Sequence, residues 1–418
     1  MRRRKSAGVV SQFLQQHYGI GWREISARFR ATLLNKTEHV ACNLCGLDDA
    51  VAVAERDKYR LPLTTVMCRG CGLLYLDPRP TTATYRQFYE EGGQEDSVYH
   101  RRVDFTNVGD LLKGYYGPDF AMDKRALAAM RDFMTKQRIG PDCRPLKEVS
   151  QQEAEDDDSL NYYGKYIYEL LKDFVPRGGK VFEPGASWGK MLLPWKVLHD
   201  CEATGVEPKV EAVRDAKEKL GLDLIQGFAD DPRIPENAYD LVLNTRTINH
   251  MLDPLGDLRN AWRWLKPGGV LFVDIQDTIR EARYEGFELN VVEIDHPYMF
   301  SQATLGAMVQ KAGFTIVRSE VKDLQSARDW DDRAPQEKQI RIIARKSEDP
   351  VAIDWPKPLE ELASLMRAQL EFDRHTVDQF QKLRRRYRRL KTQQADVRAP
   401  LPGWGAQLAG RWHSWRNR

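Results

Sequence analysis

The sequence has little of several features that mark special classes of protein. Its 6 cysteines among 418 residues are too few for a small disulfide-stapled scaffold. No apolar run reaches the roughly 18 residues that a membrane-spanning helix needs. The basic start is followed by an apolar stretch that Ser11, Gln12 and Gln15 interrupt, so we do not expect a secretory signal peptide. We expect a cytoplasmic protein, or one peripheral to the inner face of the membrane.

Net charge is also small, at +3, but it is unevenly distributed. The segment from Lys382 to Arg418 contains eleven Lys or Arg residues and one acid, Asp396. Three tryptophans lie among these basic residues, at positions 404, 412 and 415. Basic residues with Trp are typical of a segment that binds an anionic membrane surface, and nucleic acid is a less favoured partner.

The same tail supports a second interpretation. Phe380, Leu383, Tyr387 and Leu390 follow the 3-4-3 spacing of a short coiled coil. The basic helix could therefore mediate self-association instead of binding a membrane. The sequence leaves these two partners open.

From residue 179 onward, short apolar strands alternate with helical segments. Strands are expected at KVFEP, EATGVEP, LDLIQG, YDLVLNT and GVLFVDIQD, followed by an antiparallel pair formed by FTIVRSEV and QIRIIARK. This alternation predicts an α/β fold, a doubly wound parallel sheet covered by helices on both faces. The expected segments are a helical arm (1–38), a four-cysteine module (39–80), a helical linker or cap (81–175), the α/β domain (176–346) and a helical basic tail (347–418).

Four of the cysteines form two CxxC pairs, Cys42 with Cys45 and Cys68 with Cys71. A glycine follows each pair directly, which suits two tight turns that each present two thiolates. Four thiolates are a preferred tetrahedral ligand set for Zn²⁺. We expect a structural zinc site, since four protein ligands leave no position open for catalysis.

A strand that ends in an acid leads into a turn of small residues, Glu183 through Gly189. Small residues let the backbone approach a ligand, and the following helix offers free N–H groups. The next strand ends in Glu207, where an acid can accept hydrogen bonds from ribose hydroxyls. The spacing is GxSxG and not the GxGxxG of dinucleotide-binding folds, since the last glycine of that pattern would fall on Lys190.

The same turn also fits the nucleophile elbow of α/β-hydrolases, with Ser187 as the nucleophile. Asp274 or Asp277 and then His296 follow in the order that such a triad requires. A hydrolase needs several strands before its elbow, however, and this chain has a polar segment there. The hydrolase interpretation also leaves Glu207 without a role.

The ordered set of Glu183 to Gly189, GVEPKVEAVRDAKEKLGL, YDLVLNTRTINHMLDP and LKPGGVLFVDIQD resembles class I S-adenosylmethionine-dependent methyltransferases. The resemblance implies a Rossmann-like sheet of seven strands and S-adenosylmethionine as cofactor. The sequence departs from the family pattern at Ser187, which replaces a glycine, and at Phe228, where the family often has an aspartate. It implies these cofactor-binding residues: Glu183, Gly185, Ser187, Gly189, Glu207, Phe228, Ala229 and Asn244.

The segment CRGCGLLYLDPRPT ahead of such a domain resembles a bacterial group of zinc-ribbon methyltransferases. Members are often tied to polysaccharide or sugar modification. The resemblance implies that the acceptor is a hydroxyl of a sugar or glycan in polysaccharide biosynthesis. Methylation of a sugar carbon is an alternative, as is a hydrolytic or non-catalytic α/β domain with a zinc adaptor.

Two histidines follow the fourth and fifth predicted strands, at positions 250 and 296. In this fold the acceptor lies beyond the carboxyl ends of those strands. A hydroxyl acceptor must lose its proton, and histidine titrates near neutrality. His250 and His296 are therefore the candidate general bases, with Asn249 and Tyr298 as weaker candidates; a structural or substrate-orienting role for either histidine stays open.

Overall fold

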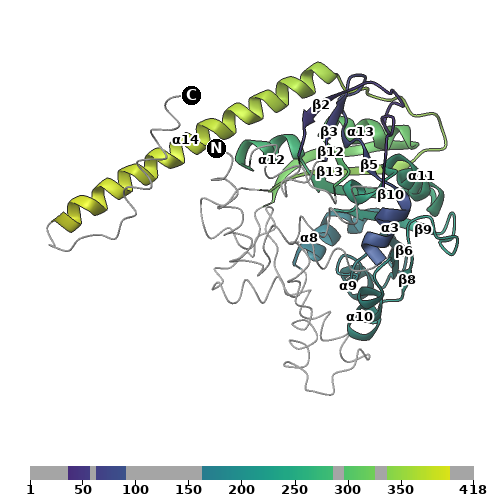
Figure 1. Ribbon diagram of the computed structural model, residues 1–418. Helices are drawn as coiled ribbons and strands as arrows, with labels where there is room; N and C mark the ends of the chain where they lie inside the picture. The colour runs from purple at the N-terminus through teal and green to yellow at the C-terminus, as the bar shows by residue number, and fades with distance from the viewer. Residues whose placement is uncertain (1–35, 57–62, 91–161, 286–295, 325–336, 396–418) are drawn as a thin grey trace. The chain divides into compact units, whose positions relative to one another are not determined.

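The computed structural model describes residues 36–56, 63–90, 162–285, 296–324 and 337–395 (Figure 1). Most of the predicted amino-terminal arm, the greater part of the linker segment and the Trp-containing end of the tail lie outside these residues. The chain divides into two compact units, Met1–Gln369 and Leu370–Arg418. The five segment boundaries expected from the sequence stay predictions.

Seven strands form the central sheet in the order β12-β13-β10-β9-β6-β7-β8. Strands β10, β9, β6, β7 and β8 run parallel, and β13 is antiparallel to both of its neighbours, β10 and β12. The predicted α/β class and the predicted carboxyl-terminal hairpin are both confirmed. The strands are β6 (Lys180–Pro184), β7 (Glu202–Glu207), β8 (Leu224–Gln226), β9 (Tyr239–Thr245), β10 (Leu265–Gln276), β12 (Phe314–Leu324) and β13 (Glu337–Lys346).

Helices cover both faces of this sheet, as the alternation of strands and helices predicts (Figure 1). Consecutive residues of β6 enter different cores: Val181 packs in the core that contains α8 and α9, and Phe182 packs in the core that contains α11 and α13. The helical elements are α8 (Tyr162–Leu171), η1 (Lys172–Phe174), α9 (Leu193–His199), α10 (Val210–Leu220), η2 (Ile248–His250), α11 (Pro254–Trp264), α12 (Thr278–Glu285) and α13 (Gln302–Lys311).

Several helix ends follow from local sequence. The side chain of Ser301 accepts from the backbone N–H of Thr304 and caps α13, as expected. Gly221 ends α10 with a φ of +62°. The residues from Trp188 to Asp200 predict a helix, but α9 begins only at Leu193, because Gly189 adopts a φ of +78°, which lies outside helical geometry. The glycine-rich turn is therefore longer than the sequence suggested.

The cysteine module is built on a second sheet of four strands, in the order β11-β4-β3-β2. Three of these strands belong to the module: β2 (Ala50–Ala54), β3 (Thr65–Cys68) and β4 (Leu74–Leu76). The fourth, β11 (Tyr298–Met299), comes from the α/β region and pairs antiparallel with β4. The module also contributes a two-stranded pair, β1 (Thr37–Glu38) with β5 (Arg79–Pro80), and leads into α3 (Thr82–Glu90).

The module and the large sheet share one hydrophobic core. Leu44, Leu73 and Tyr75 of the module pack in the same buried cluster as Phe300 and Met308 of the α/β region. Burial of this kind is the main favourable term in folding. The module is therefore packed into the α/β region and is not tethered to it by a linker alone.

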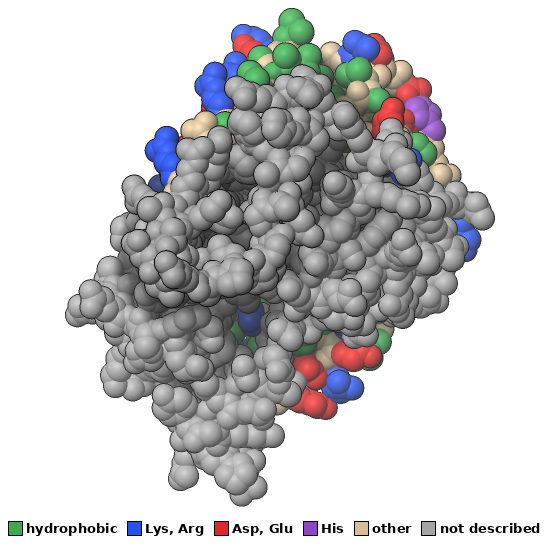
Figure 2. Space-filling view, turned by 60° about the vertical axis from the view of Figure 1, so that its left-hand side comes forward, with side chains coloured by type: hydrophobic (Ala, Val, Ile, Leu, Met, Phe, Trp, Pro, Cys, Tyr) green, Lys and Arg blue, Asp and Glu red, His purple; other side chains and the backbone are tan. Residues whose placement is uncertain are grey.

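The last described element is α14 (Pro358–Ala395), close to the helix expected from Leu359 to about Lys391. Figure 2 shows hydrophobic side chains gathered at the top of the described surface, among Lys and Arg side chains. On α14, Leu359, Met366 and Leu370 are 81%, 61% and 55% exposed. The side chains of the proposed coiled-coil positions Phe380, Leu383, Tyr387 and Leu390 lie outside the description. Among the described helices, none is both long and apolar enough to cross a bilayer.

Candidate active site

A cavity of about 550 Å³ opens at the carboxyl ends of the parallel strands. It is lined by Gly185 after β6, Glu207 at the end of β7, Gly227 after β8 and Thr245 at the end of β9. The chain runs from β6 outward to β8 and then returns to place β9 on the other side of β6. Ligands of doubly wound sheets bind at such a switch point, and the cavity lies there.

The turn after β6 needs small residues because another segment lies directly on it. A Cβ atom on Gly185 would lie 2.6 Å from Cγ2 of Thr247, closer than real contacts allow. Gly185, Ser187 and Gly189 all adopt positive φ, at +66°, +50° and +78°. The resulting turn directs the backbone N–H of Ser187 toward Oε2 of Glu207, at 2.9 Å. A hydrogen bond at the cavity thus joins the turn after β6 to the carboxyl end of β7.

Glu207 is held rigidly at the cavity wall. Its Oε2 accepts from Ser187 and its Oε1 accepts from the backbone N–H of Lys209 at 3.0 Å. Its side chain is mostly buried, and that burial raises its pKa above the ordinary value, while the two backbone hydrogen bonds oppose the rise. A fixed carboxylate that opens into a cavity is suited to accept hydrogen bonds from a ligand's hydroxyl groups.

Glu183 lies beneath this turn at the end of β6 and is 3% exposed. Burial, together with the charge of Glu207, raises the pKa of Glu183 well above its usual value. Its Oε2 is buried with no hydrogen-bond partner among the described residues. An unsatisfied acceptor at this depth is costly, and it marks the place as one where a ligand or a bridging water would be stabilising.

Phe228 and Ala229, two of the residues that the resemblance implies at the cofactor, line the cavity on a third side and supply apolar surface. Arg86 of α3 places its guanidinium carbon 4.7 Å from the centroid of the Phe228 ring and forms an ion pair with Asp230. Thr82 and Tyr85 of the same helix also line the cavity. The sequence analysis missed this contribution, because no local pattern links α3 to residues so far along the chain.

Asp257 is a second lining residue that the sequence analysis missed. It lies in the first turn of α11, whose N-cap is Asp253. Burial raises the pKa of Asp257 to about 8, with further contributions from the charges of Asp253 and Asp230. A carboxyl group that is uncharged below that pH can donate as well as accept a hydrogen bond in the cavity.

The remaining residues expected at the cofactor lie near the cavity but not on its wall. Gly189 belongs to the turn, where its N–H donates to the carbonyl of Ala186 at 2.7 Å. Asn244 lies in β9, is 2% exposed, and has a buried Oδ1 with no partner within the described part of the chain. The cavity-lining residues of the expected set are therefore Gly185, Ser187, Glu207, Phe228 and Ala229.

The two candidate bases face each other. His250 ends η2 after β9 and lines the cavity, and the ring of His296 lies 4.5 Å from it, centroid to centroid, at 68°. His296 and Asn249 are not among the lining residues. The Tyr298 hydroxyl donates to the carbonyl oxygen of Leu252 at 3.2 Å. The structure thus brings together the two histidines that the sequence could only place after separate strands.

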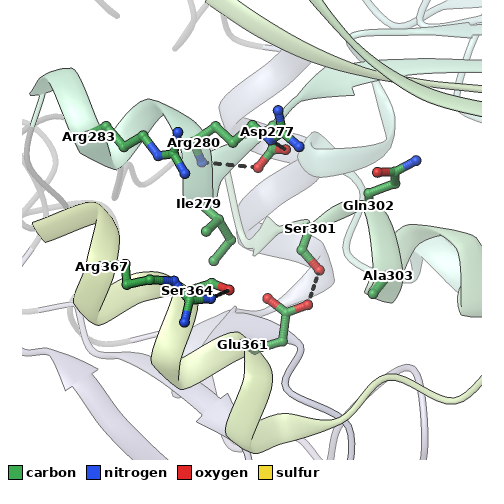
Figure 3. Close-up of a pocket in the computed structure, with 10 residues that line it drawn as sticks. All are labelled: Asp277, Ile279, Arg280, Arg283, Ser301, Gln302, Ala303, Glu361, Ser364 and Arg367. Atoms are coloured by element: carbon green, nitrogen blue, oxygen red, sulfur yellow. Dashed lines mark hydrogen bonds and ion pairs between the residues drawn. The ribbon is translucent and has the colours of Figure 1, made fainter. Parts of the chain in front are cut away.

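The carboxylates of the hydrolase interpretation lie elsewhere. Asp274 is fully buried and forms an ion pair with Arg341 at 3.1 Å. Asp277 lines a second cavity of about 400 Å³, shown in Figure 3, where it forms an ion pair with Arg280 at 3.3 Å. Neither acid lines the cavity that contains Ser187. The described geometry does not assemble a triad around Ser187.

The second cavity lies between α12, the start of α13 and α14 (Figure 3). Two of its charged side chains form hydrogen bonds with serines. The hydroxyl of Ser301 donates to Oε1 of Glu361 at 2.5 Å, and Arg367 donates to Ser364 at 2.9 Å. Burial raises the pKa of Glu361 above its usual value. The hydrogen bond from Ser301 joins the first turn of α14 to the N-cap of α13.

The four cysteines of the two CxxC pairs converge. Their Sγ atoms all lie within 4.8 Å of one another, with Cys42 to Cys71 at 3.5 Å and Cys45 to Cys68 at 3.4 Å. Zinc–sulfur bonds of about 2.3 Å in a tetrahedron place sulfur atoms about 3.8 Å apart, close to what is seen. Both turns repeat one pattern, in which the cysteine carbonyl accepts from the N–H of a glycine with positive φ, Gly46 or Gly72.

The electrostatics of this cluster favour a cation. Hydrogen bonds from the thiols of Cys42 and Cys71 lower the pKa of Cys68, and the same thiol network raises the pKa of Cys71. A divalent cation at the centre would stabilise all four thiolates together. The donor set and its spacing fit zinc.

The model of a family described as a methyltransferase domain matches residues 159–319. Among curated proteins, the chain is 27% identical over 212 residues to phosphoethanolamine N-methyltransferase 1 of Arabidopsis thaliana, covering 47% of this chain and 43% of that protein. It is 28% identical over 96 residues to the ubiquinone biosynthesis O-methyltransferase of Parvibaculum lavamentivorans, covering 23% and 36%. The chain thus spans less than half the length of these relatives.

Among solved structures, a possible histamine N-methyltransferase from Thermotoga maritima is 22% identical, with a TM-score of 0.34, and the match covers 47% of this chain and 97% of that one. The family match covers β6 to α13, which includes the glycine-rich turn, Glu207 and both histidines. The chain therefore carries a class I S-adenosylmethionine-dependent methyltransferase domain.

Proposed function

We propose that the chain binds S-adenosylmethionine in the cavity at the switch point and transfers its methyl group to a hydroxyl of a sugar or glycan. The observation that carries this proposal is the convergence of the Gly185 turn, the fixed Glu207 carboxylate and His250 on one cavity of about 550 Å³. A cavity of that size suits a cofactor together with part of an acceptor.

The residues that line the cavity have separate roles in cofactor binding. Glu207 accepts hydrogen bonds from the ribose hydroxyls, and the Gly185 turn lets the backbone approach the ligand. Phe228 and Arg86 close the cavity where the adenine ring of the cofactor would lie. Stacking on these side chains would replace the polar contact to adenine that an aspartate at position 228 would make. When bound, S-adenosylmethionine supplies a methyl group on a good leaving group, so the chain's own task is positioning and proton removal.

His250 accepts the proton of the acceptor hydroxyl, with His296 fixing its ring or receiving the proton in turn. The support is the contact between the two rings and the position of His250 on the cavity wall. General-base catalysis by a positioned side chain is worth about 10²–10⁴-fold in rate. A sugar acceptor is proposed from the resemblance of CRGCGLLYLDPRPT to sugar-modifying members, and methylation of a sugar carbon would use the same base.

A second candidate acceptor is an amine. Asp230 and Asp253 line the cavity, and an ammonium group would be attracted to their carboxylates, while the protonated carboxyl of Asp257 could form a hydrogen bond with the acceptor. Phosphoethanolamine N-methyltransferases are among the proteins that the chain resembles. An amine acceptor would need its own proton removed before transfer, for which His250 is again available.

The cysteine module is proposed to hold one structural Zn²⁺ through Cys42, Cys45, Cys68 and Cys71. Four ligands saturate the metal, so its role is to fix the two turns. For the basic tail, self-association and an anionic membrane surface stay equal proposals, and peripheral association with the membrane's inner face would follow from the second.

The deciding experiment has two stages. Calorimetry with purified chain should detect binding of S-adenosylmethionine, and no binding would reject the proposal. Methyl-labelled S-adenosylmethionine is then incubated with the chain and with fractionated cell-envelope material, sugar phosphates or small amines. Label in a sugar-containing fraction supports the hydroxyl acceptor, and label only in the amines supports the alternative.

A further inference from the structure

One wall of the candidate active site is a single stretch of chain that follows β9. The stretch runs through η2 into the first turns of α11. Whatever fixes its conformation therefore fixes the shape of the cavity. Its lining residues are Arg246, Thr247, His250, Met251, Leu252, Asp253, Gly256, Asp257 and Asn260.

The first cysteine turn caps the helix at the end of this wall. Asn43 lies between Cys42 and Cys45, and its side-chain amide donates to Oδ1 of Asp253 at 2.7 Å. Its own Oδ1 accepts from the backbone N–H of Leu255 at 2.9 Å. Asp253 in turn accepts from the N–H of Gly256 at 3.0 Å. Two of the N–H groups that α11 leaves without intrahelical partners are thus capped, one of them by the cysteine module.

The module holds the same wall at a second place. The carbonyl oxygen of Leu252 accepts hydrogen bonds from Arg79 of β5 and, at 3.2 Å, from the hydroxyl of Tyr298. Tyr298 belongs to β11, which is an edge strand of the module's own sheet through its pairing with β4. The backbone from Leu252 to Leu255 is therefore held by groups from the cysteine turn, from the two-stranded pair and from the four-stranded sheet.

We propose that the cysteine module clamps this wall in the conformation that binds ligand, with Asn43 as the positioning residue, so that metal loading of the module and cofactor binding in the cavity are coupled. The inference rests on the proposed function, because it needs a cofactor in the cavity. Coupling between two sites is reciprocal. A ligand in the cavity must therefore raise the affinity of the module for its metal, which we expect to slow release of the metal, and loss of the metal must weaken binding of the ligand.

The chain offers a matched control for Asn43. Arg69 occupies the same place in the second turn, between Cys68 and Cys71, but its side chain pairs with Asp49 of the module at 3.2 Å. Asn43→Ala removes two hydrogen bonds to the wall and should weaken S-adenosylmethionine binding by about three- to tenfold, a change of the size of one ordinary hydrogen bond. Arg69→Ala should leave that affinity unchanged. Calorimetry on zinc-loaded full-length chains measures both.

A second measurement follows the release of zinc from the module. Zinc release to a colorimetric chelator is followed with and without saturating S-adenosylmethionine. The cofactor should slow release from the wild-type chain and from Arg69→Ala by severalfold, and it should have little effect on release from Asn43→Ala. Zinc content and melting temperature are recorded for each chain, which separates a positioning effect from simple loss of the module.

The outcomes are distinct. If the wild-type chain binds no S-adenosylmethionine, the proposed function fails and the coupling fails with it. If the wild-type chain binds the cofactor, but Asn43→Ala binds it equally well and the cofactor leaves zinc release unchanged, the coupling alone is overturned. If Asn43→Ala does not fold, Tyr298→Phe removes one hydrogen bond from Leu252 and keeps the ring, and unchanged affinity in that variant would likewise overturn the proposal.

Discussion

His250 and His296 face each other with their ring centroids 4.5 Å apart, although one follows β9 and the other comes just before β11. Only His250 lines the cavity. The pair therefore has an inner member that can touch an acceptor and an outer member that can orient it. The structure therefore distinguishes the candidate general base, His250, from the candidate orienting residue, His296. The sequence could not say which histidine has which role.

The first prediction concerns this pair. With a hydroxyl acceptor, His250→Gln should lower turnover by about 10²–10⁴-fold and leave S-adenosylmethionine affinity intact, because the base is lost and the cofactor contacts remain. His296→Gln should lower turnover less. Activity should also fall on the acid side, where a protonated imidazole cannot accept a proton. Steady-state kinetics with calorimetry measures this, and full turnover in both variants would exclude histidine base catalysis.

The second prediction concerns Glu207. Glu207→Ala should weaken S-adenosylmethionine binding by about 1.5–3 kcal/mol, the range for a hydrogen bond to a charged group. Glu218→Ala removes the same charge from an exposed position on α10 and serves as the control. Calorimetry on both folded variants decides the assignment. Equal affinities in the two variants would mean that Glu207 does not contact the cofactor.

The third prediction concerns the metal. The purified chain should contain one Zn²⁺, and Cys42→Ser or Cys68→Ser should lose it and lower the melting temperature, because metal binding and folding are coupled in such sites. Cys201→Ala is the control, since Cys201 is buried in the core around α9, away from the four-cysteine cluster. Elemental analysis and thermal melts provide the measurements. Metal retained in Cys68→Ser would contradict a four-thiolate site.

The fourth prediction follows from the pKa of Asp257, which burial raises to about 8 from an ordinary 3.8. The folded state then holds a proton that the unfolded state releases, so this group's contribution to stability is complete below pH 3.8 and is lost as pH rises through about 8. The slope is at most about 1.4 kcal/mol per pH unit.

Asp257→Asn should remove this dependence, so it should stabilise the chain more at pH 8 than at pH 5. Urea unfolding at several pH values without ligand provides the free energies of unfolding. Exposed Asp223, replaced by Asn, provides a control for the change of residue type. A pH dependence that is the same in Asp257→Asn and in the wild-type chain would show that this carboxyl ionises normally.

Much of the architecture could be predicted from local patterns. The alternation of apolar strands with helices specified the seven strands of the large sheet, and Ser301 and Gly221 marked helix ends that the structure confirms. The start of α9 was placed too early because Trp188 to Leu192 have helical composition. The positive φ of Gly189 excludes a helix there, and a Cβ at this position would lie 2.5 Å from Cδ1 of Leu222, so the turn leaves room only for glycine.

The candidate site was predicted less completely. Gly185, Ser187 and Glu207 were predicted because their spacing along two consecutive strands is itself the pattern. Arg86 and Asp257 were missed, since nothing in their own neighbourhoods marks them. Arg86 reaches the cavity from α3, far back in the chain, and Asp257 reaches it from the first turn of α11. The pairing of β11 with β4 was missed for the same reason, as two residues carry no periodicity.

The sequence by itself determined the kinds of element, the four-cysteine ligand set and the acid-ended, glycine-rich turn, because these depend on residues close together in the chain. The tertiary structure decided which segments form the cavity wall, that the two histidines meet, and that Asn43 of the cysteine turn caps α11. Those contacts join residues separated by long stretches of chain. They form only when burial of a shared core brings the module and the large sheet together.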